Sequence, residues 1–160
     1  MRKILLVIAV ILMSCKSQPV VLPIPAVEVK QPEFEVVSIS ILQADLVVTE
    51  FETVLRVINP NNFAVDLSSI SYELHGNGMY WANGVANDIF RVPAESSSET
   101  KFTFSMNFID MNRRLLDDII AMRRVNYNFK GRAEVRPVIP GINPFFTNFD
   151  CSGMSDVRPR

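Results

Sequence analysis

Alternation of apolar and polar residues in short runs is the feature that most restricts what this chain can fold into. The clearest run is 101–108, in which two sets of alternate positions differ in polarity: Phe102, Phe104, Met106 and Phe108 against Lys101, Thr103, Ser105 and Asn107. Successive side chains of a β-strand point to opposite faces. The run therefore predicts a strand with one buried face and one solvated face.

The same pattern recurs along most of the chain. Further strands are predicted over 34–42, 51–58, 69–75, 79–85 and 126–136, with a last short strand around Phe145, Phe146 and Phe149. The sequence Gly76-Asn77-Gly78 predicts the turn of a hairpin, because these residues accept positive φ angles readily. About seven such strands predict a mainly β fold, an antiparallel β-sandwich of the immunoglobulin or fibronectin kind.

One segment departs from the two-residue period. In 112–125 the apolar residues recur at helical spacing, namely Leu115, Leu116, Ile119, Ile120 and Met122. This spacing predicts one amphipathic helix of about three turns, with Asp110 or Asn112 as its N-cap. We expect its apolar stripe to pack on the core of the sandwich, although a stripe of this kind also suits a partner-binding surface.

The first fifteen residues have the layout of a secretory signal. The basic pair Arg2-Lys3 precedes an apolar run, 4–13, that is too short for a bilayer span of roughly 20 residues. Its end, Leu12-Met13-Ser14-Cys15, resembles the lipobox of bacterial lipoproteins. The resemblance implies cleavage before Cys15 and acylation of its thiol and new amino terminus. The alternative is an ordinary secretory signal with an incidental cysteine.

Removal of residues 1–14 has consequences for charge and location. The remaining 146 residues carry 14 Lys and Arg against 17 Asp and Glu, a net charge of −3, without a basic patch for nucleic acid. The partner expected for Cys15 is therefore the membrane, through its acyl chains, in the bacterial cell envelope. Residue 16 is Lys rather than the Asp of the inner-membrane retention signal, which favours the periplasmic side or the outer membrane.

The rest of the chain divides into a tether, one domain and a tail. Four prolines in 16–33 predict an extended tether, although Val20, Val21 and Leu22 also suit a first strand. The predicted organisation is a signal peptide (1–14), a lipidated cysteine and tether (15–33), a β-sandwich domain (34–152) and a tail (153–160). With Cys15 lipidated, Cys151 has no intrachain partner, so apolar burial must stabilise the domain.

Several local motifs together resemble a known family. A strand ending in Asn59-Pro60-Asn61, the strand and turn of 70–78, the sequence Val92-Pro93-Ala94 and the strand 127–135 resemble the type 2 late embryogenesis abundant family, also called the WHy (water stress and hypersensitive response) domain. The resemblance implies a β-sandwich with one helix and a stress-related protective or binding role. It brings no catalytic residues. Asn59, Pro60 and Asn61 have a structural cause as well, because proline favours an extended residue before it.

The sequence contains no motif for a cofactor, a metal or phosphate. His75 is the only histidine, and we expect a solvated turn residue there rather than a catalytic base. We expect Tyr80-Trp81 to pack across a hairpin rather than form an exposed contact, and Cys151 to be a buried or half-buried structural residue. No catalytic residue, metal ligand or cofactor is predicted.

Three functions remain as hypotheses. The first is a non-enzymatic, lipid-anchored binding or protective module with an unknown protein partner. The second is a carrier of a hydrophobic ligand such as lipid, suggested by two phenylalanine-rich segments, 102–108 and 145–149, beside the predicted helix. The third is a hydrolase that uses His75. The absence of catalytic motifs favours the first.

Overall fold

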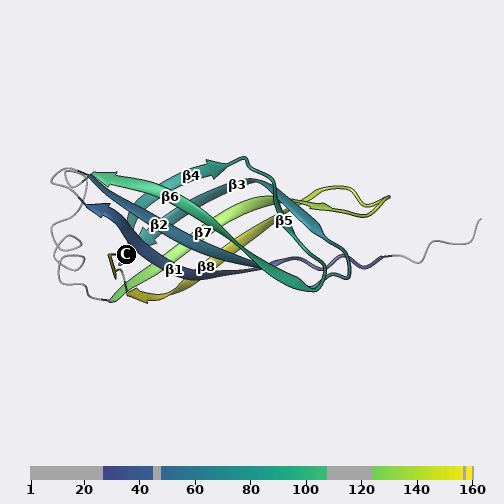
Figure 1. Ribbon diagram of the computed structural model, residues 1–160, viewed down its shortest axis with the longest axis horizontal. Helices are drawn as coiled ribbons and strands as arrows, with labels where there is room; N and C mark the ends of the chain where they lie inside the picture. Colours follow the sequence, from purple (N-terminus) through teal and green to yellow (C-terminus); the bar gives the residue numbers. More distant parts are fainter. Residues whose placement is uncertain (1–26, 45–47, 108–123, 157, 160) are drawn as a thin grey trace, which may run out of the picture.

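Nine strands make up the part of the chain that the computed structural model describes, residues 27–44, 48–107, 124–156 and 158–159. The strands are β1 (Glu33–Ala44), β2 (Val48–Asn59), β3 (Val65–Gly76), β4 (Met79–Ala86), β5 (Phe90–Val92), β6 (Ser96–Asn107), β7 (Arg124–Pro137), β8 (Phe145–Asp156) and β9 (Arg158–Pro159). They form two sheets that run along the long axis of the molecule (Figure 1). We name them sheet A, with the order β6-β2-β1-β9, and sheet B, with the order β4-β3-β7-β8 and with β5 paired to β3.

The prediction of a mainly β, antiparallel fold is confirmed. All the pairings are antiparallel except the short contact of β1 with β9, where Ser40 and Ile41 pair with Arg158 and Pro159. The predicted hairpin turn lies where it was expected, with positive φ angles at Asn77 and Gly78 between β3 and β4. No helix long and apolar enough to cross a membrane occurs among the described residues.

Aromatic rings fill the space between the sheets. Phe102, Phe104 and Met106 of β6 are buried and Thr103 is exposed, which confirms the predicted faces of this strand. The rings of Phe104 and Phe51 stack with centroids 5.2 Å apart. Burying a side chain of this size contributes about 1.5–3 kcal/mol. Cys151 is a free thiol and contributes no disulfide bond, so the domain is stabilised by its apolar core.

The predicted helix over 112–125 lies outside the described residues except at its end. Arg124 and Val125 belong to β7, so the prediction of helix at these two residues is wrong. They pair with Asp156 and Ser155 of β8, and Val125 is buried in the core. A β-branched residue in a half-buried ladder favours the strand, and this pairing is invisible to a local helical pattern.

The structure differs from the sequence predictions in three further strand and segment boundaries. The sequence did not predict β5, because three residues are too few to show an alternating pattern. The strand is defined by its pairing with Val65–Leu67 of β3. β8 continues to Asp156, so the predicted boundary after residue 152 falls inside a strand. Residues 27–32, assigned to the tether, lie against the domain: Pro32 is buried, and Val27 and Val29 pack on the core.

Candidate functional site

The Asn-Pro-Asn motif (Asn59, Pro60 and Asn61) ends β2 with two buried amides. Asn59 is only 1% exposed. Its Nδ2 donates hydrogen bonds to the backbone oxygens of Phe63 at 2.7 Å and Pro93 at 3.0 Å. Its Oδ1 accepts from the backbone nitrogen of Asn61 at 3.1 Å. One side chain thus joins the end of β2 to the turn after it and to the loop before β6.

Asn61 extends this network to the N-terminal segment. Its Oδ1 accepts from the backbone nitrogen of Lys30 at 2.7 Å, and its Nδ2 donates to the backbone oxygen of Lys30 at 2.9 Å. The backbone oxygen of Asn61 accepts from the nitrogen of Glu95 at 2.9 Å. Because the amides are satisfied by the chain's own backbone, the motif is a structural clamp and offers little to a ligand.

His75 lies at the end of β3, next to the turn, as its sequence position indicated. Its Nε2 hydrogen-bonds Glu73 Oε1, and its ring meets the ring of Tyr80 edge-on, with centroids 5.9 Å apart. Among the described residues, no serine hydroxyl and no cysteine thiol hydrogen-bonds this imidazole. The described residues therefore offer this imidazole no serine or cysteine nucleophile to activate.

Tyr80 and Trp81 point in opposite directions, as successive residues of a strand do. The register shifts between Leu74 and His75, and beside this shift both Trp81 and Ala82 are buried. A Cβ on Gly76 would lie 1.8 Å from the Trp81 ring, so the indole lies directly over the partner strand. The predicted packing across the hairpin is confirmed for Trp81, whereas Tyr80 remains 56% exposed.

Cys151 is half-buried on β8, in agreement with the expectation of a structural residue. Its Sγ donates to the backbone oxygen of Phe34 at 3.3 Å, across the seam between β8 and β1. Burial raises the pKa of the thiol, and the nearby Asp150 and Glu35 add to the effect. A raised pKa disfavours the thiolate, so this residue is a poor nucleophile.

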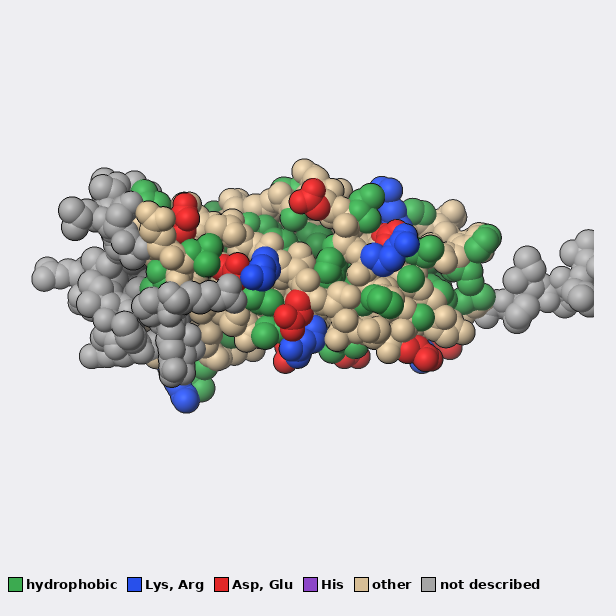
Figure 2. All heavy atoms as spheres, in the orientation of Figure 1, with side chains coloured by type: hydrophobic (Ala, Val, Ile, Leu, Met, Phe, Trp, Pro, Cys, Tyr) green, Lys and Arg blue, Asp and Glu red, His purple; other side chains and the backbone are tan. Residues whose placement is uncertain are grey.

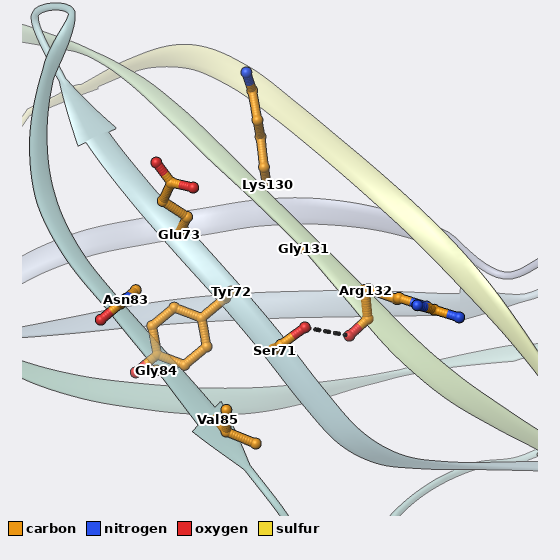
Figure 3. A pocket seen from close by; sticks show the side chains of 9 residues that line it. All are labelled: Ser71, Tyr72, Glu73, Asn83, Gly84, Val85, Lys130, Gly131 and Arg132. Atoms are coloured by element: carbon orange, nitrogen blue, oxygen red, sulfur yellow. Dashed lines mark hydrogen bonds between the residues drawn. The ribbon is translucent and has the colours of Figure 1, made fainter.

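A polar hollow on the outer face of sheet B is the site that sequence reasoning missed (Figure 3). Two rows of outward side chains border it, one row being Val85, Ser71 and Arg132 and the other Asn83, Glu73 and Lys130. Its floor is the intervening row Gly84, Tyr72 and Gly131, and its volume is about 530 Å³. Ser71 Oγ donates to the backbone oxygen of Arg132 at 3.3 Å.

The shape of the hollow depends on the close approach of the β7 backbone at Gly131 to β3 and to Phe149. A Cβ on Gly131 would lie 2.2 Å from the Phe149 ring and 2.4 Å from the backbone oxygen of Ser71. Only glycine fits there, so the β7 backbone lies low at the floor. Glu73 is directly opposite Lys130 in the ladder, which places an acceptor and a donor side by side on a rigid surface. The outward faces were predictable from alternation, but the pairing of β3 with β7 was not.

Within the described part of the chain, three buried polar atoms on or near the inner face of β2 have no hydrogen-bond partner: Thr49 Oγ1, Thr53 Oγ1 and Trp81 Nε1. Phe51 lies between the two threonines along the strand and contacts the Trp81 ring with centroids 5.7 Å apart. Unpartnered buried polar groups are uncommon and destabilising. Among the described residues, no group of three His, Cys, Asp or Glu is arranged to hold a metal ion.

Solved structures with the same fold come from several sources. A solution structure of a protein from Arabidopsis thaliana matches with a TM-score of 0.61 at 14% identity, covering 83% of this chain and 86% of that one. A solution structure of a candidate late embryogenesis abundant protein matches with a TM-score of 0.56 at 14% identity, covering 81% and 72%. An X-ray structure from a structural genomics programme gives 0.51 at 11% identity, covering 82% and 90%.

These likenesses show a shared fold, and the sequence comparison identifies the family. No curated protein sequence matches the chain. A family model described as late embryogenesis abundant protein matches residues 54–148, which begin within β2 and end within β8. The match covers more than half of the sequence, and the chain therefore belongs to the late embryogenesis abundant family, type 2.

Proposed function

We propose that this protein is a non-enzymatic binding or stress-protective module of the bacterial cell envelope, anchored by acyl chains on Cys15. The observation that carries the binding role is the polar hollow of sheet B. Glu73 and Lys130 stand at its border, open to solvent, and the guanidinium of Arg132 lies over the Phe146 ring, 4.0 Å from its centroid. An open, polar surface of this kind suits the exposed polar groups of another protein better than an apolar small molecule, which prefers an enclosed pocket.

The arrangement of the titratable groups argues against catalysis. Cys151 hydrogen-bonds a backbone oxygen and has a raised pKa, and the imidazole of His75 contacts Glu73 and Tyr80. In acid–base catalysis, the base must lie within hydrogen-bond reach of the proton that it removes, and the group that carries this proton must be held in position. The described residues bring no such pair together.

Anchoring is supported by the sequence around Cys15. The segment Leu12-Met13-Ser14-Cys15 closes an apolar run, and the mature chain has a net charge of −3. A negative surface gains little from anionic lipid head groups, so attachment would depend on the acyl chains. One chain gives marginal binding, whereas two or more give stable attachment.

The binding role is tested by protection of a reporter enzyme during heating or freeze–thaw. We expect the domain to preserve reporter activity and the double variant Glu73→Ala/Lys130→Ala to lose most of that effect, because it removes the facing acceptor and donor. A charge-matched control is Glu28→Ala/Lys30→Ala, whose side chains are exposed away from the hollow. Equal protection by both variants would exclude the hollow as the binding surface.

The anchor is tested by Cys15→Ser in the full-length chain. We expect the variant to lose the acyl mass on the mature N-terminus and to leave the membrane fraction in a detergent-free wash. Unchanged processing and unchanged membrane association would refute lipidation at Cys15.

A carrier of hydrophobic ligands is the second candidate, favoured by the unpartnered Thr49, Thr53 and Trp81 atoms around Phe51. A polar head group between the sheets would satisfy them. Three of the phenylalanine rings named for this role pack on other core rings instead: Phe102 on Phe129, Phe104 on Phe51, and Phe149 on Phe34 at 4.6 Å between centroids. Organic extraction of the purified domain discriminates the two: a stoichiometric lipid supports a carrier, and its absence supports the binding module.

A further inference from the structure

The hairpin between β7 and β8 has an unusual composition for an exposed connection. No charged residue occurs between Arg136 and Asp150, and the loop itself, 138–144, reads Val-Ile-Pro-Gly-Ile-Asn-Pro. Val138 is 46% exposed; Phe146, just beyond the loop, is 55% exposed, with the guanidinium of Arg132 over its ring at 4.0 Å from the centroid. Isolated exposed apolar residues are ordinary, but a continuous uncharged apolar segment at a protruding tip indicates a contact surface.

The hairpin is held firmly at its base and is free at its tip. The backbone nitrogen of Val138 donates to the oxygen of Ala64 at 2.8 Å, and Val135 pairs with Phe145 as the last step of the ladder. At the tip, Gly141 has a φ of 85°, and nothing lies within 4 Å of the position that its Cβ would occupy. The apolar tip therefore projects away from the body of the domain.

The described chain begins at the same end of the molecule. Thr147 Oγ1, just after the hairpin, donates to Gln31 Oε1 at 3.4 Å, and Lys30 is clamped by Asn61. In Figure 1 the purple start of the described chain and the β7–β8 hairpin extend toward the same side. Hydrophobic side chains are also visible at this right-hand end in Figure 2.

The length of chain back to Cys15 limits how far this end can lie from a membrane. Eleven residues, 16–26, separate Cys15 from Val27. A proline-rich segment of this length spans about 35 Å at ~3.1 Å per residue. A strand of twelve residues is about 40 Å long. The opposite end of the domain therefore lies about one strand length farther from the anchor.

We infer that the hairpin 138–144 inserts shallowly into the lipid surface and sets the domain upright on the membrane. The inference rests on the proposed lipidation of Cys15. Val138 and Ile142 would bury apolar surface at the interface without moving a charge out of water. Sheet B would then stand along the membrane normal, and its polar hollow would face the envelope space.

The test uses the full-length lipidated protein on vesicles of phosphatidylethanolamine and phosphatidylglycerol that contain doxyl-labelled lipid. Val138→Trp and Ile142→Trp place a fluorescent indole on the hairpin. Val85→Trp is the matched control, because Val85 is 63% exposed on β4, at the border of the hollow. Trp81 is buried and contributes the same background to every variant. Circular dichroism of each variant establishes that it is folded.

We expect a blue shift and strong quenching for both hairpin variants and neither effect for Val85→Trp. Equal quenching at all three positions, or stronger quenching at Val85→Trp, in protein that floats with the vesicles would overturn the membrane-contacting hairpin and leave the anchor intact. Failure of the unsubstituted protein to float, together with no acyl mass on Cys15, would overturn both the anchor and the hairpin contact that depends on it.

Discussion

At the scale of single residues, the most consequential side chains are two amides. Asn59 and Asn61 form a pair in which Asn61 Nδ2 donates to Asn59 Oδ1 at 2.9 Å, and their other polar atoms bind backbone from three separate segments. A buried amide that is fully paired specifies one arrangement of the chain, because any shift leaves several groups unsatisfied.

Asn59→Ala is therefore expected to lower the free energy of unfolding by about 2–4 kcal/mol, since it removes several hydrogen bonds and strands their buried partners. That is a large fraction of the ~5–15 kcal/mol of a typical domain. Chemical denaturation measures the loss. The control is Asn62→Ala, which is exposed and should change stability by less than about 0.5 kcal/mol. Equal losses of stability for the two variants would show that the buried hydrogen bonds of Asn59 do not stabilise the fold.

The thiol of Cys151 is expected to be slow to alkylate. In a chain that begins at Val27 it is the only cysteine, so iodoacetamide modification followed by mass spectrometry measures it directly. Because burial, Asp150 and Glu35 all raise the pKa of this thiol, the native protein should react more slowly than the urea-unfolded protein at pH 8. The native rate should still be rising at a pH where the unfolded rate has levelled off. A native rate at or above the unfolded rate would contradict the assigned environment.

At the scale of elements, irregularities determine which face of each strand meets the core. In β1 the register shifts between Val36 and Ser38, so that Phe34 and Val36 face inward before the shift and Ile39 and Ile41 after it. In β3 a similar shift surrounds Ser69, which has a φ of 49°. An extra residue reverses the alternation within a strand. Strands without such a shift, like β6, keep one phase throughout.

The phase of β6 gives an element-scale prediction. Phe104→Ala should lower the free energy of unfolding by about 3–5 kcal/mol, because it empties a buried site that stacks on Phe51. Thr103→Ala on the opposite face should change it little. Thermal and urea unfolding of the two variants, compared with the unsubstituted domain, provide the measurement. A larger loss for Thr103→Ala than for Phe104→Ala would refute the assigned faces.

At the scale of the whole molecule, the domain begins before its first strand. The N-terminal segment 27–32 packs Val27 and Val29 on the core and pairs Lys30 with Asn61, on the side where the hairpin 138–144 projects. The segment therefore fixes the end from which a lipid anchor would hold the domain, and it connects that anchor to the clamp at the end of β2.

Shortening the chain tests this organisation. A chain that begins at Glu33 should fold with a β-sheet circular dichroism spectrum. Its free energy of unfolding should fall by about 2 kcal/mol, because it lacks the hydrogen bonds of Lys30 and Gln31 and the partial burial of two valines. Its Tm should fall by roughly 5–10 °C relative to a chain that begins at Val27. Identical melting of the two chains would show that the segment only rests on the domain.

The sequence by itself determined the strands with a regular period and the local turns. Residues 101–107 and the turn at Gly76-Asn77-Gly78 were predictable because alternation and positive φ are local properties that require no partner. The same locality explains why the motif ending in Asn61 was recognisable before any of its contacts was known. It also explains the error at Val125, where a helical pattern continued into a residue that a long-range ladder holds as strand.

Only the tertiary structure decided which strands pair, and the candidate site depends on that choice. The polar hollow exists because β3 lies between β4 and β7, which brings Glu73 opposite both Asn83 and Lys130. Lys30 and Pro93 meet the clamp in the same way, from positions about thirty residues distant in the chain. The backbone hydrogen bonds of strands are the same for every sequence, so the residues of one strand do not determine which strand it pairs with. The pairing is selected by burial of the apolar side chains of the whole core.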